Sequence, residues 1–584
     1  MRTLLSLAAL ALAACATPPA DPPAAPQAAA AQPAAVSPVG DWNGVLTIPN
    51  GPELRMGVTI EEISPGAYAA TVHNPDQGAP PRQSESVAFA DGKLEVRTTA
   101  ATFSGSWDAA TSSFIGEYAG RGGSFPLTLK SGPVPPVPPN PPIAGIDGRW
   151  EGAVMGIPLV LRIMTDTTGT LAFLDSPAQG TGNIPVPTIT READTVAFSI
   201  PIIGAAFSGT LAPEGDTIAG TFTQGGPIPL ELRHVSADVT PAVAIARPQE
   251  PEKPYSYREE AVTVVNGDLS LPCTLTLPEG NGPYPAALLL SGSGAQDRDE
   301  SLMGHRPFLI VADHLTRHGF AILRCDDRDY VRPRTDGEMS SLVTDFVTDA
   351  NAALALLRTH ADIDPKRIGL IGHSEGGVTA PRVAVDDPGV AFVITLAGVG
   401  ARGRDTLLMQ RELLMTSIGA PQETIDQTRA VFAAMFDAML AAPDDAAAKA
   451  AAIAGVKALP NMPGMEDYEA SDEDIDMIAS QFASKYYRDL LAWDPAPVLA
   501  RINVPFLALN GSKDVQVEAK QNLAGYKAGL AHNPDVTVIE LPGLNHLFQT
   551  APTGAITEYA TIEETFAPAA LTAMSDWLTA RMKP

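Results

Sequence analysis

Residues 372–377 (GHSEGG) place a serine, Ser374, inside a glycine-rich turn. The apolar run 368–371 precedes the turn, and residues 378–380 can begin a helix. When a strand, a sharp turn and a helix follow in this order, the serine on the turn has a strained backbone conformation. The small residues on both sides of it let the chain segments pass closely enough for this turn. The helix also directs its free N–H groups and its positive dipole end toward the serine. The pattern predicts a nucleophile, and the plainer alternative is a glycine-rich turn with an incidental serine.

The elements around this serine change character at about Pro251. From there, apolar β-like runs alternate with helical stretches, which is typical of a parallel sheet. An Ala- and Met-rich stretch with helical periodicity covers about 401–497. An antiparallel pair is expected over 262–277, helices over 308–318 and 342–359, and further strands over 286–290, 320–324, 368–371, 390–396, 506–509 and 536–541.

Four stretches of this region resemble the α/β-hydrolase superfamily: 291–299 (SGSGAQDRD), 324–328 (RCDDR), the serine turn, and 511–514 (GSKD) with Asn545-His546. The resemblance covers roughly Pro251 to Pro584, and its nearest branch is the bacterial esterases related to dienelactone hydrolases and prolyl-oligopeptidase-like peptidases. It implies an α/β-hydrolase fold. It also implies that residues 401–497 are a helical lid, because this fold often carries its lid after the strand that follows the serine.

A serine hydroxyl needs an adjacent base to act as a nucleophile. The resemblance implies the chain order nucleophile, acid, base, which makes Asp514 the acid and His546 the base. Both follow expected strands, so both fall at the carboxyl ends of the strands, where α/β sheets place their sites. His546 would take the proton of Ser374 and return it to the leaving group, and Asp514 would orient the imidazole. Asp405, which also follows a strand, is the alternative acid.

The tetrahedral intermediate of acyl transfer needs two backbone N–H donors. Glu375, the residue after the nucleophile, is expected to supply one. Alignment with the H-G-x-G pattern of the family places the other on Ser293, where Gly292 and Gly294 allow a close approach. A slip of one residue in that alignment would move the second donor.

The chain has 584 residues, too many for one core, so three or four domains are expected. A net charge of -28 disfavours nucleic acid as a partner. His314 and His318 have the i, i+4 spacing of metal ligands, but no third ligand is evident, and a solvated helix face is expected instead. No metal or cofactor is predicted, and the oligomeric state stays open.

The N-terminus has the pattern of a targeting segment. Arg2 precedes an apolar run, Leu4 to Ala14, that is too short to span a bilayer as a mature helix. Its end, Leu12-Ala13-Ala14-Cys15, resembles the lipobox of bacterial lipoprotein signal peptides, which implies lipidation of Cys15. Residues 1–14 are therefore expected to be a signal peptide, and the protein to be anchored in the cell envelope, at the outer membrane facing the periplasm. An ordinary secretory peptide is the alternative.

Residues 15–36 are mostly Ala, Pro and Gln and are expected to be an extended tether. An internal repeat follows, 37–132 and 144–237, separated by the Pro-rich spacer 133–143. The two copies share Trp-x-Gly, Phe-Ser-Gly and Pro-x-Gln motifs in the same order. Their short Val-, Thr- and Phe-rich runs predict two all-β domains, each closed as a small barrel or sandwich, with the tryptophans as core anchors.

Cys273 and Cys325 are the two cysteines that follow Cys15. Two cysteines do not make a disulfide framework, and both lie in apolar, strand-like stretches. Buried free thiols are expected, with a bridge as the alternative.

The leading hypothesis is a serine hydrolase domain, residues 251–584, that cleaves small carboxylic esters through an acyl-enzyme. An aminopeptidase or oligopeptidase and a thioesterase would use the same residues. A hypothesis of another class is an envelope binding protein with an inactive hydrolase domain, which reactivity of Ser374 toward a fluorophosphonate would exclude.

Overall fold

The computed structural model describes residues 36–582, apart from 49–52, 78–80, 85, 99–100, 121–122, 155–156, 180, 225–226, 242–244, 333–339, 342, 418 and 461–470. The expected signal peptide, Cys15 and nearly all of the expected tether lie outside the described residues. Within the described part, no helix is both long enough and apolar enough to cross a membrane.

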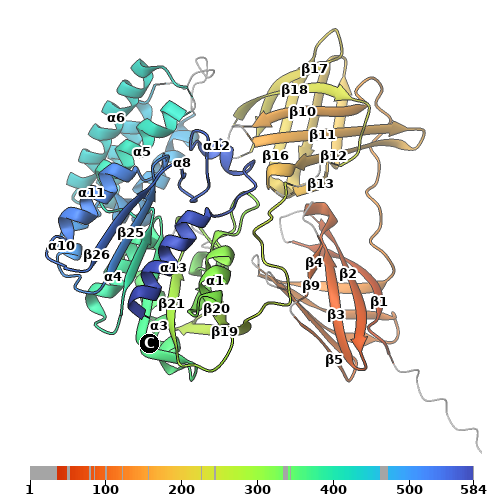
Figure 1. Cartoon of the computed structure of the whole chain (residues 1–584). Helices are drawn as coiled ribbons and strands as arrows, with labels where there is room; N and C mark the ends of the chain where they lie inside the picture. The colour runs from red at the N-terminus through yellow and green to blue at the C-terminus, as the bar shows by residue number, and fades with distance from the viewer. Residues whose placement is uncertain are drawn as a thin grey trace, which may run out of the picture. The chain divides into compact units, whose positions relative to one another are not determined.

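Two antiparallel sheets of nine strands each form the N-terminal half, and each curls into a half-barrel (Figure 1). The strand orders are β4-β3-β2-β1-β9-β8-β7-β6-β5 and β13-β12-β11-β10-β18-β17-β16-β15-β14, which are the same order shifted by nine. The first sheet contains β1 (Gly40–Thr47), β2 (Glu53–Ser64), β3 (Ala67–His73), β4 (Arg82–Gln83), β5 (Ser86–Ala90), β6 (Lys93–Arg97), β7 (Ala101–Asp108), β8 (Ser113–Gly120) and β9 (Gly123–Ser131). The second contains β10 (Gly148–Val154), β11 (Ile157–Asp166), β12 (Gly169–Ser176), β13 (Thr181–Pro185), β14 (Thr188–Glu192), β15 (Thr195–Ile200), β16 (Ala205–Leu211), β17 (Thr217–Thr223) and β18 (Pro227–Ser236).

The repeated motifs have the same structural role in both sheets. The Pro-x-Gln motifs form the short 3-10 helices η1 (Pro75–Gln77) and η2 (Pro177–Gln179), and a third, η3 (Pro201–Ile203), follows β15. Trp42 of β1 and Trp150 of β10 are buried core residues, as the sequence predicts.

Matched glycines face each other across two strand pairs. Gly105 lies opposite Gly116 in one sheet, and Gly209 lies opposite Gly220 in the other. A Cβ atom on Gly116 would lie 2.4 Å from the Cα of Gly105, and one on Gly220 would lie 2.3 Å from the Cα of Gly209. No side chain fits at this spacing, which explains why both copies keep glycine on both strands.

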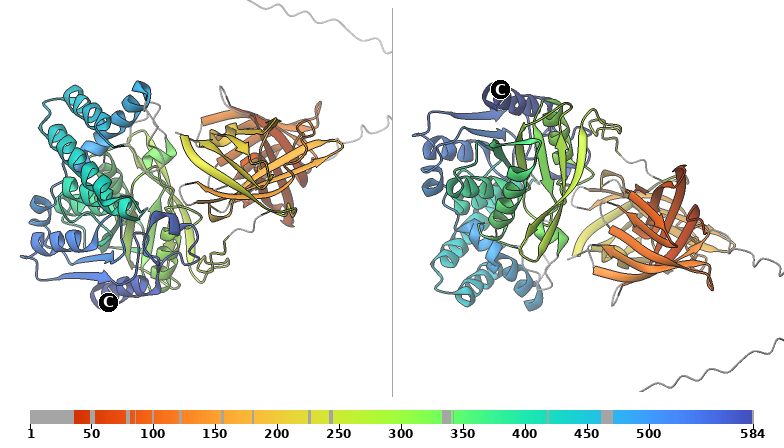
Figure 2. Two further views of the ribbon diagram at one scale, coloured as in Figure 1. Left: turned by 90° about the horizontal axis from the view of Figure 1, so that it is seen from above. Right: turned by 90° about the horizontal axis from the view of Figure 1, so that it is seen from below.

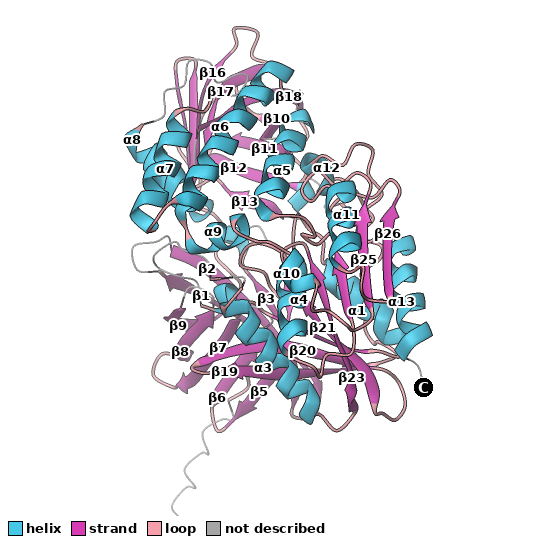
Figure 3. Cartoon of the chain, turned by 90° about the vertical axis from the view of Figure 1, so that its left-hand side faces the viewer, coloured by secondary structure: helices cyan, strands magenta, loops and turns pink. Residues whose placement is uncertain are grey.

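The C-terminal domain is built on an eight-stranded sheet in the order β19-β20-β22-β21-β23-β24-β25-β26. Figure 3 shows this sheet with helices packed along its strands. Strands β19 (Arg258–Asn266) and β20 (Leu269–Leu277) pair antiparallel, and β20 also pairs antiparallel with β22 (Ala321–Cys325). The remaining pairs are parallel and connect β21 (Tyr284–Leu290), β22, β23 (Ile363–His373), β24 (Val393–Leu396), β25 (Phe506–Gly511) and β26 (Val536–Leu541).

Helices cover both faces of this sheet, so its parallel strands are apolar on both sides. Leu370 of β23 faces a core that includes α3 (Asp345–Thr359), α4 (Gly376–Asp386) and α11 (Ala519–Gly529). The next residue, Ile371, faces a second core that includes α1 (Pro307–Arg317) and α13 (Pro568–Met582). The short helices α2 (Arg328–Val331), α10 (Ala496–Leu499) and α12 (Ile556–Tyr559) complete the domain.

A group of helices is inserted between β24 and β25. Figure 2 shows these helices, coloured teal, apart from the helices that flank the sheet. The group consists of α5 (Gly403–Ser417), α6 (Gln422–Ala441), α7 (Asp445–Lys457), α8 (Asp472–Ala483) and α9 (Lys485–Leu491). Their apolar side chains form one core with Val378 and Val399 of the domain body. The expected helical insertion is therefore present, and its action as a lid stays a prediction.

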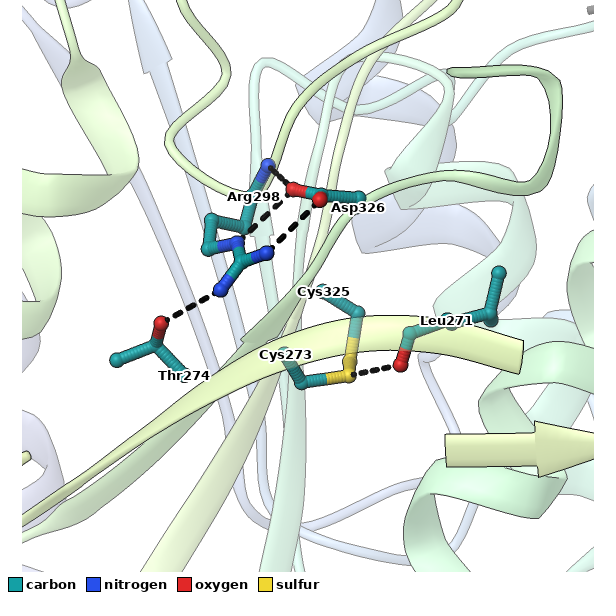
Figure 4. The surroundings of a disulfide bond; sticks show 6 residues. All are labelled: Leu271, Cys273, Thr274, Arg298, Cys325 and Asp326. Atoms are coloured by element: carbon teal, nitrogen blue, oxygen red, sulfur yellow. Dashed lines mark hydrogen bonds and ion pairs between the residues drawn. A yellow bond between two sulfur atoms is a disulfide. The ribbon is translucent and has the colours of Figure 1, made fainter. Parts of the chain in front are cut away.

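Cys273 and Cys325 form a disulfide, so the expectation of free thiols is wrong (Figure 4). Both lie in strands, as predicted. The two strands, β20 and β22, are not consecutive, and their antiparallel register places the cysteines directly opposite each other. The sequence does not reveal this pairing, because β21 lies between the two strands in the chain.

Contacts of the C-terminal domain begin a few residues before the predicted boundary at Pro251. Arg247 donates hydrogen bonds to the carbonyl oxygens of Ala560 and Ile562, at 2.9 and 2.8 Å. Gln249 accepts the N–H groups of Thr565 and Phe566. We therefore assign residues 247–250, called the strap below, to the C-terminal domain.

Candidate active site

Ser374 lies on a sharp turn between β23 and α4. Its φ of 53° is in the left-handed region, which is uncommon and costly for a residue with a side chain. The turn is held by a hydrogen bond of 2.8 Å from the N–H of Ser374 to the carbonyl of Leu396. A Cβ atom on Gly372 would lie 2.1 Å from the carbonyl oxygen of Gly376. The glycine on this side of the serine is therefore required by the closeness of the turn.

Ser374, His546 and Asp514 are joined by hydrogen bonds. The Oγ of Ser374 lies 3.0 Å from Nε2 of His546, and Nδ1 of His546 lies 2.7 Å from Oδ2 of Asp514. All three are buried, with exposures of 8%, 4% and 4% in that order. The other oxygen of Asp514 accepts the N–H groups of Gln516 and Val517, both at 2.8 Å, which fixes the carboxylate. The structure thus brings the three predicted residues together.

The alternative acid, Asp405, does not contact His546. It lies in the first turn of α5, and its carboxylate pairs with Arg404 at 3.1 Å. Asp514 follows β25, and β25 pairs with β26. Its carboxylate therefore lies beside the loop after β26, which carries His546.

The loop after β21 passes directly against Ser374. A Cβ atom on Gly292 would lie 3.2 Å from the Cβ of Ser374. The N–H of Gly292 is already occupied, since it donates to Oε1 of Glu300 at 2.6 Å. Within the described residues, no hydrogen bond engages the N–H of Ser293 or of Glu375. The N–H groups of both predicted donors are therefore unoccupied, whereas that of Gly292 is not, and their role as oxyanion donors stays a prediction.

Two contacts near the site were not predicted from the sequence. The hydroxyl of Tyr486, on α9, donates to Oε2 of Glu375. The ring of His373 bridges Glu300 and the backbone carbonyl of His546. His373 is adjacent to Ser374 in the sequence, which was a signal that it lies at the site. The inserted helices contain no sequence motif from which the contact of Tyr486 could be predicted.

A pocket lies beside this constellation, behind the loop after β21. Its lining includes Gly292, Asp327, Glu375 and Tyr486, and Ser374 does not line it. Burial raises the pKa of Glu375 to about 7, although the hydrogen bond from Tyr486 opposes the shift. Burial also raises the pKa of Asp327 well above its usual range, against the hydrogen bond that it accepts from Ser291. This pocket therefore presents carboxyl groups that are easily protonated.

Residues 326–328 form ion pairs only in part. Asp326 pairs with Arg298 at 2.8 Å, and Arg328 pairs with Asp349 at 2.6 Å, whereas Asp327 accepts a hydroxyl. In the described part of the chain, no group of three or more His, Cys, Asp or Glu side chains has an arrangement that could hold a metal ion.

Comparisons with known proteins agree with this architecture. Residues 287–558 match the model of the alpha/beta hydrolase family. Esterase EstD of Thermotoga maritima is 26% identical over 294 residues, which are 50% of this chain and 61% of that protein. The chain thus spans about three fifths of the length of this relative.

Solved structures of similar proteins each cover a little over half of the chain. Dienelactone hydrolase from Anabaena variabilis is 16% identical, with 56% of this chain and 100% of that chain covered and a TM-score of 0.32. The Pyrococcus furiosus esterase Pf2001 is also 16% identical, with 56% and 94% covered and a TM-score of 0.34. The strand order, the family match and the turn at Ser374 together define the C-terminal domain as an α/β-hydrolase fold.

Proposed function

We propose that the C-terminal domain hydrolyses small carboxylic esters through an acyl-enzyme. The observation that carries the proposal is the continuous series of hydrogen bonds from Ser374 through His546 to Asp514. The similarity to an esterase supports the choice of ester chemistry.

In the first half-reaction, Nε2 of His546 takes the proton of Ser374 while Oγ attacks the ester carbonyl. The N–H groups of Ser293 and Glu375 donate to the oxyanion that forms. His546 then gives its proton to the departing alcohol, and the acyl group stays on Oγ. In the second half-reaction, His546 takes a proton from water while the water oxygen attacks the acyl carbonyl. His546 then returns the proton to Oγ of Ser374 as the bond between Oγ and the acyl carbon breaks, and the carboxylic acid leaves.

The activity test is a panel of p-nitrophenyl esters, acyl thioesters and aminoacyl p-nitroanilides on the purified protein. We expect the kcat/KM for short-chain esters to be higher than that for the thioesters or the anilides. Faster turnover of anilides would indicate a peptidase instead, and faster turnover of thioesters a thioesterase.

The identity of the acid is tested by two matched variants. Asp514→Asn should lower kcat by about 10⁴-fold, because the imidazole loses the partner that sets its tautomer. Asp405→Asn, which changes the rival carboxylate in the same way, should leave kcat within about twofold. The reverse pattern would transfer the role to Asp405.

We also propose that the protein is lipid-anchored through Cys15 in a bacterial envelope. The lipobox-like end of the N-terminal segment motivates the proposal. The disulfide between Cys273 and Cys325 supports it, because such bonds persist in oxidising compartments such as the periplasm. Cys15→Ser should move the protein from the membrane fraction to the soluble fraction, and continued membrane association would contradict the anchor.

A further inference from the structure

Glu300 connects two of the loops that surround Ser374. Its Oε1 accepts the N–H of Gly292 at 2.6 Å, and it also lies 2.8 Å from Nδ1 of His373. The other ring nitrogen of His373, Nε2, lies 3.1 Å from the backbone carbonyl oxygen of His546. The chain of contacts therefore joins the loop after β21, the turn of the nucleophile and the loop of the catalytic base.

The partners of His373 fix the number of protons on its ring. A carbonyl oxygen only accepts hydrogen bonds, and an ionised carboxylate only accepts as well. With Glu300 ionised, both ring nitrogens of His373 donate, so the ring is an imidazolium with Glu300 as its counter-ion. The pair is buried, with side-chain exposures of 7% and 5%, so each charge depends on the other.

Two further observations separate this pair from an ordinary core ion pair. Glu300 has a φ of 53°, which is left-handed like that of Ser374. Its second oxygen, Oε2, is buried and has no hydrogen-bond partner among the described residues. Strain and an unsatisfied polar atom are features that accumulate at functional sites.

We propose that Glu300 and His373 are positioning residues that hold the loop after β21 and the His546 loop against Ser374, and that they do so only while His373 is protonated. The inference rests on the proposed ester hydrolysis. Neither residue touches the reacting atoms in this role. Each acts through a backbone group, Gly292 on one side and the carbonyl of His546 on the other.

The proton on His373 makes the positioning dependent on pH. Burial lowers the pKa of His373, but the polar groups around the ring together raise it above its usual value, and the charge and hydrogen bond of Glu300 are the largest of these effects. The hydrogen bond to the His546 carbonyl and the charge of Asp514 act in the same direction. Because the folded pKa is raised, the bridge is intact at lower pH and is lost as the pH rises through that pKa. The activity should therefore decline on the alkaline side.

The test compares three variants of the full chain: Glu300→Gln, His373→Asn and the double variant. Glu300→Gln keeps an acceptor for Gly292 but removes the counter-ion, so buried His373 loses its second proton. We expect kcat to fall by about 10- to 100-fold with KM within about threefold, since misplacement of catalytic loops acts on the transition state. The double variant should be no slower than the slower single variant, because the two residues act as one unit.

The pH profile distinguishes positioning from a merely structural role. Profiles are recorded in a Glu375→Gln background, which removes the nearby carboxyl that titrates at about 7. In that background the alkaline decline of kcat should move to lower pH in Glu300→Gln. The matched control is Glu260→Gln on strand β19, which changes a carboxylate that lies 3.1 Å from Nε2 of His360 in a more exposed His–Glu contact. It should change neither kcat nor the profile.

Each result has a defined meaning. Titration with a fluorophosphonate counts folded active sites, so the loss of kcat is expressed per site even if a variant is less stable. Glu300→Gln with unchanged kcat and an unchanged profile would overturn the inference, as would losses that add fully in the double variant. A failure of the proposed function would give a different result. In that case, the Ser374→Ala variant would still hydrolyse the ester.

Discussion

The hydroxyl of Tyr486 donates a hydrogen bond to the carboxyl group of Glu375, the residue that directly follows Ser374. Tyr486 belongs to α9, so the inserted helices contact the turn of the nucleophile. Both side chains are buried. Any movement of the insertion that breaks this contact would leave a buried carboxyl without its donor.

Tyr486→Phe should therefore lower the free energy of unfolding by about 1–3 kcal/mol, the cost of leaving a buried polar group unpaired. Urea denaturation of the purified variant measures it. Tyr487→Phe is the matched control on the same helix, since no hydrogen bond joins its hydroxyl to Glu375 and its removal should cost less. Equal effects of the two variants would show that the contact with Glu375 contributes no stability.

Glu375 should make stability depend on pH in a predictable direction. Its pKa is raised by burial to about 7, above that of an unfolded glutamic acid near 4.5. Its contribution is therefore present below about pH 4.5 and is lost as the pH rises through about 7. Glu375→Gln should have nearly the same Tm as the wild type at pH 4.5 and a higher Tm at pH 8. A Tm difference that does not change between these pH values would contradict the shift.

The disulfide should stabilise the domain strongly. Cys273 and Cys325 are 52 residues apart, and closing a loop of this length removes about 4 kcal/mol of entropy from the unfolded chain. The double variant Cys273→Ser with Cys325→Ser should lose about 2–4 kcal/mol in denaturant unfolding. A reductant should destabilise the wild type to a similar degree and leave the double variant unchanged. If the reductant has no effect on the wild type, the bond does not form in solution.

The strap should be needed by the C-terminal domain. Gln249 binds the backbone of Phe566, whose ring stacks on Phe548 at 5.2 Å, and Phe548 is two residues from His546. A fragment that starts at Ile245 should hydrolyse a small ester within about tenfold of the full chain. A fragment that starts at Pro251 should have a lower Tm and lower activity. Equal behaviour of the two fragments would show that the strap is dispensable, and a folded longer fragment with a hundredfold loss would assign the β domains a part in the site.

Features with a local signal were predictable from the sequence. The apolar run before Ser374 predicted β23, and the loops of Asp514 and His546 follow strands whose apolar runs are equally clear. The repeat predicted two all-β regions, because Trp42 and Trp150 begin matching strand patterns. The nine-stranded half-barrel form was not predicted, since strand order depends on pairings between distant segments.

Features that depend on tertiary register were not predictable. Cys273 and Cys325 face each other because β20 lies beside β22, which residue spacing does not show. Glu300 and His373 meet only because β21 pairs with β23, which places the loop after β21 beside the turn that carries His373. Tyr486 reaches Glu375 from an insertion whose packing has no sequence motif.

The kcat of Ser374→Ala on a short-chain p-nitrophenyl ester is the most direct test of the account. Without the hydroxyl there is no acyl-enzyme, and His546 has no proton to take from residue 374. The account predicts a loss of about 10⁵–10⁶-fold in kcat in a variant whose circular dichroism matches the wild type. Turnover of Ser374→Ala within about tenfold of the wild type would contradict it.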